Sequence, residues 1–311
     1  MKVLISGGAG YIGSMLVEKL LANTSHNVTV VDSLFYKQSP FGSEFSNPRF
    51  TFVKGDIREP RTMAPLEKEA DVIIPLAALV GAPICNLDPI AAESVNKTAI
   101  LDLFKRSSDD QLIIMPTTNS AYGTGQEDGY CDENTELNPI SKYAIDKVEI
   151  EKSLMERKSS ISFRLATVFG MSRRMRLDLL VNDFCYRAMT DGFMVLYEGH
   201  FRRNFIHVQD VVSLFVNAID NSETYLSEIY NVGLTEANLT KIDLCENIKK
   251  VFPDFNYFCA EFATDPDQRD YLVSNSKLEG TGWKPSVNLF DGILELKHGL
   301  QSVKKMGHSN I

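Results

Sequence analysis

Lys2-Val-Leu-Ile-Ser6 runs directly into Gly7-Gly-Ala-Gly10-Tyr-Ile-Gly13, and this segment indicates the class of fold. The short apolar run is typical of a strand, and the residues that follow from Ser14 (SMLVEKLL) place apolar side chains at helical spacing. Glycines permit a tight turn and let the backbone approach a pyrophosphate at the start of a helix. The segment therefore predicts a strand–turn–helix unit that binds a dinucleotide, with the glycines in either of two registers, 7/10/13 or 8/10/13.

An acidic residue closes the next predicted strand. Residues 27–31 (NVTVV) are rich in β-branched side chains, and Asp32 follows them, 19 residues beyond Gly13. A carboxylate at this place accepts hydrogen bonds from the adenosine ribose hydroxyls and repels a 2′-phosphate. Ser33 and Leu34 come next, with no arginine to receive such a phosphate. The pattern favours NAD over NADP as the cofactor.

Predicted strands and helices alternate through the first half of the chain. Further strands are expected at residues 50–53, 71–76, 111–115 and 161–166, and a helix at 89–106. This alternation predicts an α/β fold with a Rossmann-type, doubly wound parallel sheet, whose ligands bind at the carboxyl ends of the strands. Residues in or after these elements are expected to complete the cofactor pocket: Asp56, Ile57, Leu76, Ala77, Ala78 and Asn96.

The composition argues against several classes of protein. A formal net charge of −9 without any basic run argues against nucleic acid as the main partner. The five cysteines are scattered without a Cys-x-x-Cys pair and indicate reduced thiols, and the five histidines do not cluster at metal-ligand spacing, so no metal site is expected. We find no signal peptide and no apolar run near the ~20 residues that cross a bilayer. We expect a cytoplasmic protein that binds small molecules.

Two segments carry candidate catalytic side chains. Residues 116–123 (PTTNSAYG) follow a predicted strand and place Thr118 at the ligand-binding edge of the sheet. Tyr143 and Lys147 are four residues apart in a helix predicted from about 139 to 157, so they share a face. A phenol with a pKa near 10 is a poor base at neutral pH, and a neighbouring ammonium lowers that pKa. We interpret Tyr143 as a proton acceptor from an alcohol.

Together these motifs resemble the extended short-chain dehydrogenase/reductase family, the NAD-dependent nucleotide-sugar epimerases and dehydratases. The family pattern combines a Gly-x-x-Gly-x-x-Gly turn, an acidic strand end, a Ser/Thr loop ending in Tyr-Gly, and Tyr-x-x-x-Lys. The resemblance implies that Tyr143 is the catalytic base, that Lys147 holds the nicotinamide ribose and acidifies the tyrosine, and that Thr118 hydrogen-bonds the reacting oxygen. It also implies cofactor contacts from the turn itself, including Tyr11 and Ile12.

The second half of the chain resembles the substrate-binding portion of the same family. Arg203 lies in a segment (RRNFIHVQD) similar to the family's Arg-Asp-Phe-Ile-x-Val-x-Asp, and Arg269 lies in a second matching segment that begins at Asp267. The resemblance implies that both arginines contact the diphosphate of a sugar nucleotide, for which a guanidinium is suited. The other residues expected at the substrate are Asn119, Ser120, Arg176 and Asn182.

One departure from the family pattern narrows the predicted reaction. Members that eliminate water usually have Thr-Asp-Glu where this chain has Thr118-Asn119-Ser120, and an amide and a hydroxyl cannot perform that paired acid/base task. A 4,6-dehydratase is therefore disfavoured. Residues 75–83 (PLAALVGAP), 164–170 (RLATVFG) and 176–184 resemble more closely the enzymes that act at C-4 of GDP-activated heptoses in bacterial capsule pathways. This implies oxidation of a GDP-heptose of the mannoheptose type to its 4-keto form; a 4-epimerase and a non-catalytic NAD-binding sensor remain alternatives.

The resemblance also implies how the chain is divided and assembled. An NAD-binding domain is expected at residues 1–168, with a returning segment at about 203–230. The substrate-binding portion is expected mainly at 169–202 and 231–311. A homodimer is expected to form through the helices at about 89–106 and 139–157.

Overall fold

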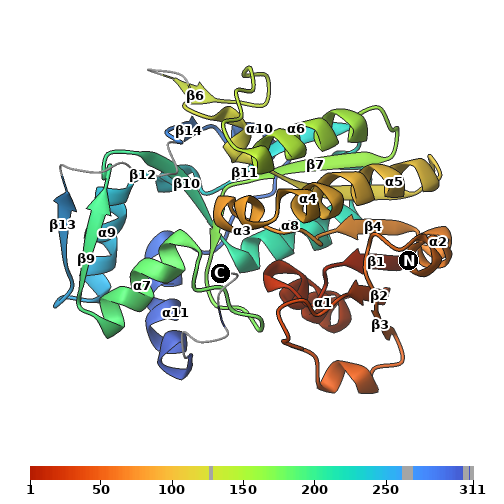
Figure 1. Ribbon diagram of the computed structural model, residues 1–311, viewed down its shortest axis with the longest axis horizontal. Coiled ribbons are helices and arrows are strands. Elements are labelled where there is room, and N and C mark those ends of the chain that lie inside the picture. Colours follow the sequence, from red (N-terminus) through yellow and green to blue (C-terminus); the bar gives the residue numbers. More distant parts are fainter. Residues whose placement is uncertain (126–128, 261–268, 304–307, 309–311) are drawn as a thin grey trace.

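A seven-stranded sheet in which every paired strand is parallel forms the centre of the protein (Figure 1). The computed structural model describes residues 1–125, 129–260, 269–303 and 308. In spatial order the strands are β3 (Phe50–Lys54), β2 (Asn27–Asp32), β1 (Lys2–Ser6), β4 (Val72–Pro75), β5 (Leu112–Thr118), β7 (Ser160–Leu165) and β11 (Glu228–Val232). The predicted Rossmann-type fold class is confirmed.

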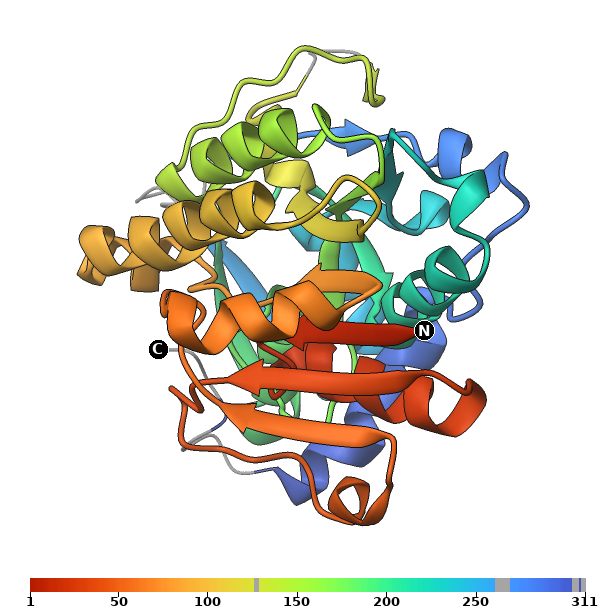
Figure 2. The ribbon, with the colours of Figure 1, turned by 90° about the vertical axis from the view of Figure 1, so that its right-hand side faces the viewer.

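The order of the strands fixes where ligands bind. The chain leaves β1 for β2 on one side, whereas β4 lies on the other side of β1 (Figure 2). Ligands of such sheets bind outside the carboxyl ends of the strands where the order reverses. The glycine turn after β1 and the loop after β4 both lie at this point.

The predicted strands occur with small shifts in their ends, and one is longer than expected. Strand β5 continues to Thr118 because β7 supplies parallel partners along its whole second half, with Thr118 opposite Leu165. The residues expected to form a loop after this strand therefore begin inside the sheet. Thr118 is thus held by backbone pairing as well as by its own side chain.

Helices cover the sheet, and their ends differ from the predicted ones. They are α1 (Tyr11–Asn23), α2 (Pro60–Glu69), α3 (Ala82–Leu87), α4 (Pro89–Glu93), α5 (Ala99–Arg106), α6 (Lys142–Leu154), α7 (Leu180–Thr190), α8 (Val208–Asp220), α9 (Lys241–Val251), α10 (Ser276–Glu279) and α11 (Leu289–Gly299). The predicted helix at 89–106 is α4 and α5 joined by a π-helical turn, Ser94–Thr98. Helix α6 begins at Lys142 instead of near 139, because the Ser141 hydroxyl caps it by accepting from the Ala144 N–H.

The described residues also form three small sheets. Strand β10 (Arg202–His207) pairs with β8 (Thr167–Phe169) and β12 (Asn238–Thr240). Strand β9 (Phe193–Tyr197) pairs with β13 (Asn256–Ala260), and β6 (Tyr130–Cys131) pairs with β14 (Leu272–Val273).

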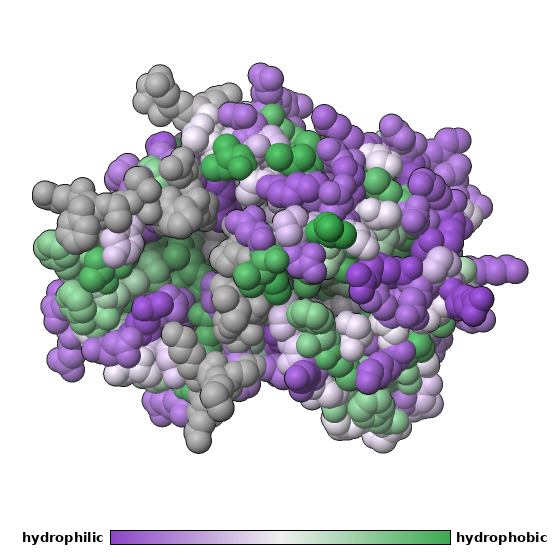
Figure 3. Space-filling model, in the orientation of Figure 1, coloured by the Kyte–Doolittle hydropathy of each residue, from purple (hydrophilic) through white to green (hydrophobic). Residues whose placement is uncertain are grey.

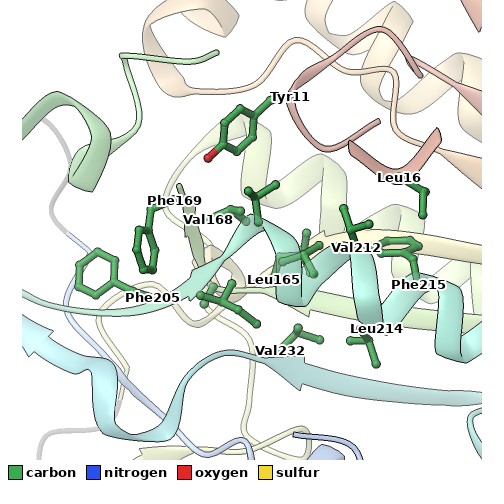
Figure 4. Close-up of a cluster of buried hydrophobic side chains, with 14 of the residues drawn as sticks. Tyr11, Leu16, Leu165, Val168, Phe169, Phe205, Val212, Leu214, Phe215 and Val232 are labelled. Atoms are coloured by element: carbon green, nitrogen blue, oxygen red, sulfur yellow. The ribbon is translucent and has the colours of Figure 1, made fainter. Parts of the chain in front are cut away.

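One hydrophobic core runs from the main sheet into the sheet of β8, β10 and β12 and the sheet of β9 and β13. Figure 4 shows Leu16 and Tyr11 of α1, Phe215 of α8, Phe169 of β8 and Phe205 of β10 in this cluster of buried side chains. Because the core is continuous, the start of α1 is held in a fixed position relative to the loop that follows β8. Both segments contribute to the site described below.

Some apolar side chains lie on the surface. Figure 3 shows them gathered over β9 and β13, where Phe193, Val195, Tyr197 and Phe258 are exposed. A separate exposed group lies on α3, α4 and α6, namely Leu87, Ile90 and Ile145. Within the described ranges, every helix is too short or too polar to cross a bilayer.

Candidate active site

The glycine turn is built for close contacts between backbones. Gly7 has a left-handed φ of +74°, and a Cβ there would lie 2.5 Å from the backbone nitrogen of Ala77 in the loop after β4. A Cβ on Gly13 would lie 2.6 Å from the Gly7 carbonyl oxygen. Gly10 precedes the first residue of α1, so its surroundings include the N–H groups at the start of a helix. The turn thus offers an anion site to a pyrophosphate, with Gly7 as its left-handed residue.

Asp32 ties this turn to the end of β2. Its two carboxylate oxygens accept from the N–H of Ala9 (2.9 Å) and of Leu34 (2.8 Å). Burial raises its pKa, and these two hydrogen bonds together with Arg174 oppose that rise. The carboxylate lines a cavity that extends from the glycine turn to the ends of β3 and β4.

The cavity has the lining that a dinucleotide requires. Gly7, Gly10, Asp32, Asp56, Ile57, Leu76, Ala77 and Ala78 all line it, as the sequence predicted. At its far end the Arg58 guanidinium donates to both carboxylate oxygens of Asp56, which lowers the pKa of Asp56. Acidic, small and apolar residues therefore occupy the places expected for ribose, pyrophosphate and adenine. The residues present fit NAD.

Three of the residues predicted to bind the cofactor direct their side chains toward other parts of the protein. Asn96 is buried, and its amide accepts from the Leu79 N–H (2.7 Å) and donates to the Leu79 carbonyl (2.8 Å), so it positions the loop after β4. The Tyr11 hydroxyl donates to the Gly170 carbonyl (2.6 Å), and Ile12 packs against the core. The reason is the early start of α1, which leaves the backbone N–H groups of Tyr11 and Ile12 as the parts that face a phosphate.

Asn182 was predicted to bind substrate, and the structure gives it a different role. Its side chain is fully buried; the amide oxygen accepts from the Gly170 N–H (3.0 Å) and the amide nitrogen donates to the Arg176 carbonyl (2.9 Å). With both ends of the amide used inside the protein, Asn182 is a positioning residue for the segment between Gly170 and Arg176.

Hydrogen bonds connect the end of β5 and the residues after it to Arg269, in the second half of the sequence. The Thr118 hydroxyl donates to the Ser120 hydroxyl (3.0 Å), and the Arg269 guanidinium donates to the same Ser120 oxygen. Asn119 is fully buried, and neither of its amide atoms has a hydrogen-bond partner in the part of the chain that the structure describes. The start of the predicted diphosphate segment, Asp267 and Gln268, lies outside the described residues.

Tyr143 and Lys147 lie on α6, which contacts the turn that contains Asn119 and Ser120. The Lys147 ammonium is buried, donates to the Pro116 carbonyl of β5 (3.1 Å), and lies 5.9 Å from the centroid of the Tyr143 ring. Pro116 is two residues before Thr118 on the same strand. Lys147, and with it Tyr143, is therefore held against the carboxyl end of β5, the strand that ends at Thr118.

The pKa of Tyr143 differs from the prediction. Burial is the main cause that raises the pKa of Tyr143 to about 12. The charges of Arg176 and Arg269 oppose this rise, and Cys85 adds to it. Burial also lowers the pKa of Lys147 to about 8, which Asp146 partly opposes. Lys147 was expected to lower the pKa of the phenol, whereas in the protein without ligands burial raises this pKa, because desolvation disfavours the phenolate.

Two of the arginines predicted to bind substrate, Arg176 and Arg203, are buried. Arg176 pairs with Asp178, and its positive charge lowers the pKa of Tyr143. Arg203 is only 2% exposed, donates to the Arg202 carbonyl (2.8 Å), and lies over the Tyr271 ring. The three arginines expected to bind substrate thus come from three separate segments of the chain.

A buried ionic network fixes the strand and the helix that carry these residues. Glu151, one turn after Lys147 on α6, accepts from Thr117 of β5 (2.9 Å), Ser162 of β7 (2.7 Å) and the Arg164 guanidinium (2.6 Å). Arg164 also donates to the Tyr122 hydroxyl (2.9 Å). All of these side chains are buried.

Two cavity residues escaped the sequence analysis. Tyr36 and Arg174 both line the cofactor cavity, and the Arg174 guanidinium lies 4.3 Å from the centroid of the Tyr36 ring. Tyr36 follows the acidic strand end by four residues, and Arg174 belongs to a visible arginine cluster at 173–176. Proximity to Asp32 in the sequence could have suggested Tyr36, but only the fold brings Arg174 to it.

Comparison with known proteins agrees with this geometry. The chain is 29% identical to an uncharacterized UDP-glucose epimerase of Bacillus subtilis, over 94% of this chain and 96% of that protein. It is 28% identical to UDP-glucuronic acid decarboxylase 3 of Arabidopsis thaliana, over 94% and 87% of the two chains.

Solved structures agree as well. The UDP-glucose 4-epimerase of Thermotoga maritima with UDP-glucose is 25% identical with a TM-score of 0.83, over 97% of this chain and 99% of that one. The UDP-glucose 4-epimerase of Thermus thermophilus in complex with NAD has the same fold, at 24% identity and a TM-score of 0.83 over 98% and 100% of the chains. The model of the NAD dependent epimerase/dehydratase family matches residues 3–233. The chain is an NAD-dependent enzyme and belongs to the NAD dependent epimerase/dehydratase family.

Proposed function

We propose that this enzyme oxidises C-4 of a nucleotide-activated sugar, a GDP-linked heptose of the mannoheptose type, to the 4-keto form. The observation that supports the proposal is that Lys147, which lies 5.9 Å from the centroid of the Tyr143 ring, donates to the Pro116 carbonyl of β5, two residues before Thr118. We further propose that residues 169–202 and 231–311 mainly bind the substrate.

In the proposed reaction Tyr143 accepts the proton of the C-4 hydroxyl while Thr118 hydrogen-bonds the same oxygen. NAD, when bound, accepts the hydride that leaves this carbon. The high pKa of Tyr143 means that the phenol is neutral at pH 7 in the protein without ligands. Arg176 and Arg269 supply positive charge beside it, and this charge favours the phenolate as the proton is transferred.

Asn119 supports oxidation over elimination. Loss of water from a neighbouring carbon requires a side chain that can protonate the departing hydroxyl. The buried amide of Asn119 stands where such an acid is expected in the dehydratases, and an amide does not titrate in this range. Its two unpaired amide atoms can instead hydrogen-bond a sugar hydroxyl.

A 4-epimerase is the second candidate, since both UDP-glucose 4-epimerases described above share the whole fold. The two reactions begin with the same hydride transfer and differ in whether the hydride returns to C-4. The GDP-linked heptose rests on the resemblance of residues 75–83, 164–170 and 176–184 to the heptose branch, whereas the named relatives act on UDP-sugars.

The test is to incubate the enzyme with GDP-heptose, GDP-mannose, UDP-glucose and dTDP-glucose, and to follow reduced nicotinamide by absorbance and products by NMR. The proposal predicts reduced cofactor and a ketone, or its hydrate, at C-4 with the GDP-heptose. A C-4 epimer without net reduction would replace the proposal by the epimerase. Inactivity with all four sugars together with unaltered cofactor would support a non-catalytic NAD-binding protein.

We also propose a homodimer formed through α4, α5 and α6. Ion pairs join these helices within one chain, Lys97 with Glu149 and Lys142 with Glu93, so they present one common face. Leu87 is 78% exposed and Ile90 84% exposed at one end of this face, and Ile145 is exposed on α6. Burying such a group of side chains against a second copy is favourable by roughly 25 cal/mol per Å² of apolar surface.

A further inference from the structure

The segment after β8 crosses the start of α1. The Ser172 hydroxyl donates to the Tyr11 carbonyl (2.7 Å), and the Tyr11 hydroxyl donates to the Gly170 carbonyl (2.6 Å). Gly170 has a left-handed φ of +113°, and a Cβ there would lie 2.2 Å from the His207 ring nitrogen, so the chain can turn here only with glycine. Residues 170–176 therefore form a strap held over the first turn of α1, where the pyrophosphate of a dinucleotide lies.

Arg174 extends from this strap into the cofactor cavity. It is 3% exposed, and its guanidinium lies over the Tyr36 ring. It lines the same cavity as Asp32, Tyr36 and the glycine turn.

Tyr36 provides an independent indication of a ligand. Its hydroxyl is buried, yet no described group hydrogen-bonds to it. Buried hydroxyls are rarely left without a partner, and a phenol in a cavity next to an arginine is suited to donate to a phosphate oxygen.

We propose that Arg174 and the Tyr36 hydroxyl bind the pyrophosphate of NAD, closing the cofactor cavity from the side opposite the helix α1 N-terminus. The same strap carries Arg176 toward Tyr143, and Asn182 holds both of its ends through the Gly170 N–H and the Arg176 carbonyl. One short segment therefore provides Arg174 to the cofactor and Arg176 to the surroundings of Tyr143. This inference depends on the NAD site and not on the identity of the sugar, so it can fail or stand separately from the proposed substrate.

The test compares ligands that contain different parts of NAD. Nucleotide-free wild type, R174Q and Y36F are titrated calorimetrically with NAD, ADP, adenosine and adenosine 2′-phosphate. Because a charge-assisted hydrogen bond contributes about 1.5–3 kcal/mol, R174Q should weaken NAD and ADP alike by roughly ten- to hundredfold and leave adenosine unchanged. Y36F should weaken the same two ligands by a smaller factor.

Controls separate this result from a general loss of structure. Arg187 on α7 pairs with Asp183 on the surface, so R187Q should bind every ligand as the wild type does. R174K, which keeps the charge but not the planar fork, should fall between the wild type and R174Q. Equal weakening of adenosine and ADP in R174Q, weakening confined to adenosine 2′-phosphate, or no weakening at all would each overturn the assignment of Arg174. Unchanged affinities in Y36F would overturn that of Tyr36.

Discussion

At the scale of single residues, burial moves the pKa values of the two central side chains in opposite directions. The phenol of Tyr143 is raised to about 12 and the ammonium of Lys147 is lowered to about 8. Both shifts favour the neutral forms, because a charge inside the protein loses its hydration. The side chains are therefore placed for proton transfer, but their charged forms depend on other charges that enter or face the site.

Replacing Tyr143 with Phe should remove the proton acceptor without disturbing the cofactor cavity. We expect Y143F to bind NAD with the affinity of the wild type and to lose roughly 10²–10⁴-fold in the rate of hydride transfer. Single-turnover kinetics that follow reduced nicotinamide measure this rate, and calorimetry measures the affinity. Turnover equal to that of the wild type would contradict the role given to Tyr143.

Lys147 should give the nucleotide-free protein a characteristic pH dependence of stability. Its folded pKa of about 8 lies below the ordinary 10.5, so between these values the unfolded chain binds a proton that the folded chain does not. Stability due to this group is therefore lowest below pH 8 and rises with pH through the window. Relative to K147M, the wild type should gain about 2 kcal/mol between pH 7.5 and 9.5. Urea unfolding of both proteins at each pH measures the difference, and a constant difference would contradict the shifted pKa.

At the scale of elements, the site depends on how α6 is fastened to β5 and β7. Glu151 joins all three through Thr117, Ser162 and Arg164. Because Thr117 precedes Thr118 and Glu151 follows Lys147 by one turn, this network keeps the threonine, the tyrosine and the lysine in register.

Removing the charge of Glu151 should leave Arg164 buried without its anion. We expect E151Q to lower the free energy of unfolding by about 3–5 kcal/mol and to lower kcat as well, because the end of β5 is no longer held against α6. Glu69 offers a matched control, since its ion pair with Lys2 is exposed and E69Q should change stability by less than about 1 kcal/mol. Equal small losses in both variants, measured by urea unfolding, would contradict the network's role.

The sequence predicted elements and motifs well, and it predicted side-chain directions poorly. Periodicity and glycine spacing are local, so β1, the turn and α1 could be read from residues 2–23. The roles of Asn96 and Asn182 could not, because they depend on which backbone groups lie opposite each amide after folding. Arg174 lies over the Tyr36 ring, and the segment that carries it is held at the start of α1 by contacts distant in sequence, which no local pattern encodes.

At the scale of the whole molecule, segments that are distant in the sequence meet at the site, and two of them carry arginines. Arg269 meets Ser120 after β5, and the strap at 170–176 meets the glycine turn after β1. The continuous core between the main sheet and the smaller sheets keeps these contacts rigid. We therefore expect the residues proposed to bind the cofactor and those proposed to bind the substrate to keep fixed positions relative to one another.

The proposed assembly is tested by placing a charge on its apolar face. We expect the wild type to have twice the chain mass of 34.8 kDa in solution, and L87E/I90E to have the mass of one chain, since a buried carboxylate opposes association. Phe290 on α11 is 46% exposed away from this face, so F290E should remain dimeric. Light scattering coupled to size-exclusion chromatography measures the masses. A wild-type monomer, or an L87E/I90E variant that remains a dimer, would contradict the proposed interface.

The most direct test of the central claim follows the hydrogen on C-4 of the sugar. GDP-heptose carrying deuterium at C-4 is mixed with the NAD-loaded enzyme, and the reduced cofactor and the sugar are analysed by mass spectrometry and NMR. The account predicts that deuterium appears on the nicotinamide, that the sugar becomes a 4-ketone, and that Y143F transfers deuterium roughly 10²–10⁴-fold more slowly. Deuterium that stays on the sugar, at its original position or on the inverted C-4, would contradict oxidation by this enzyme.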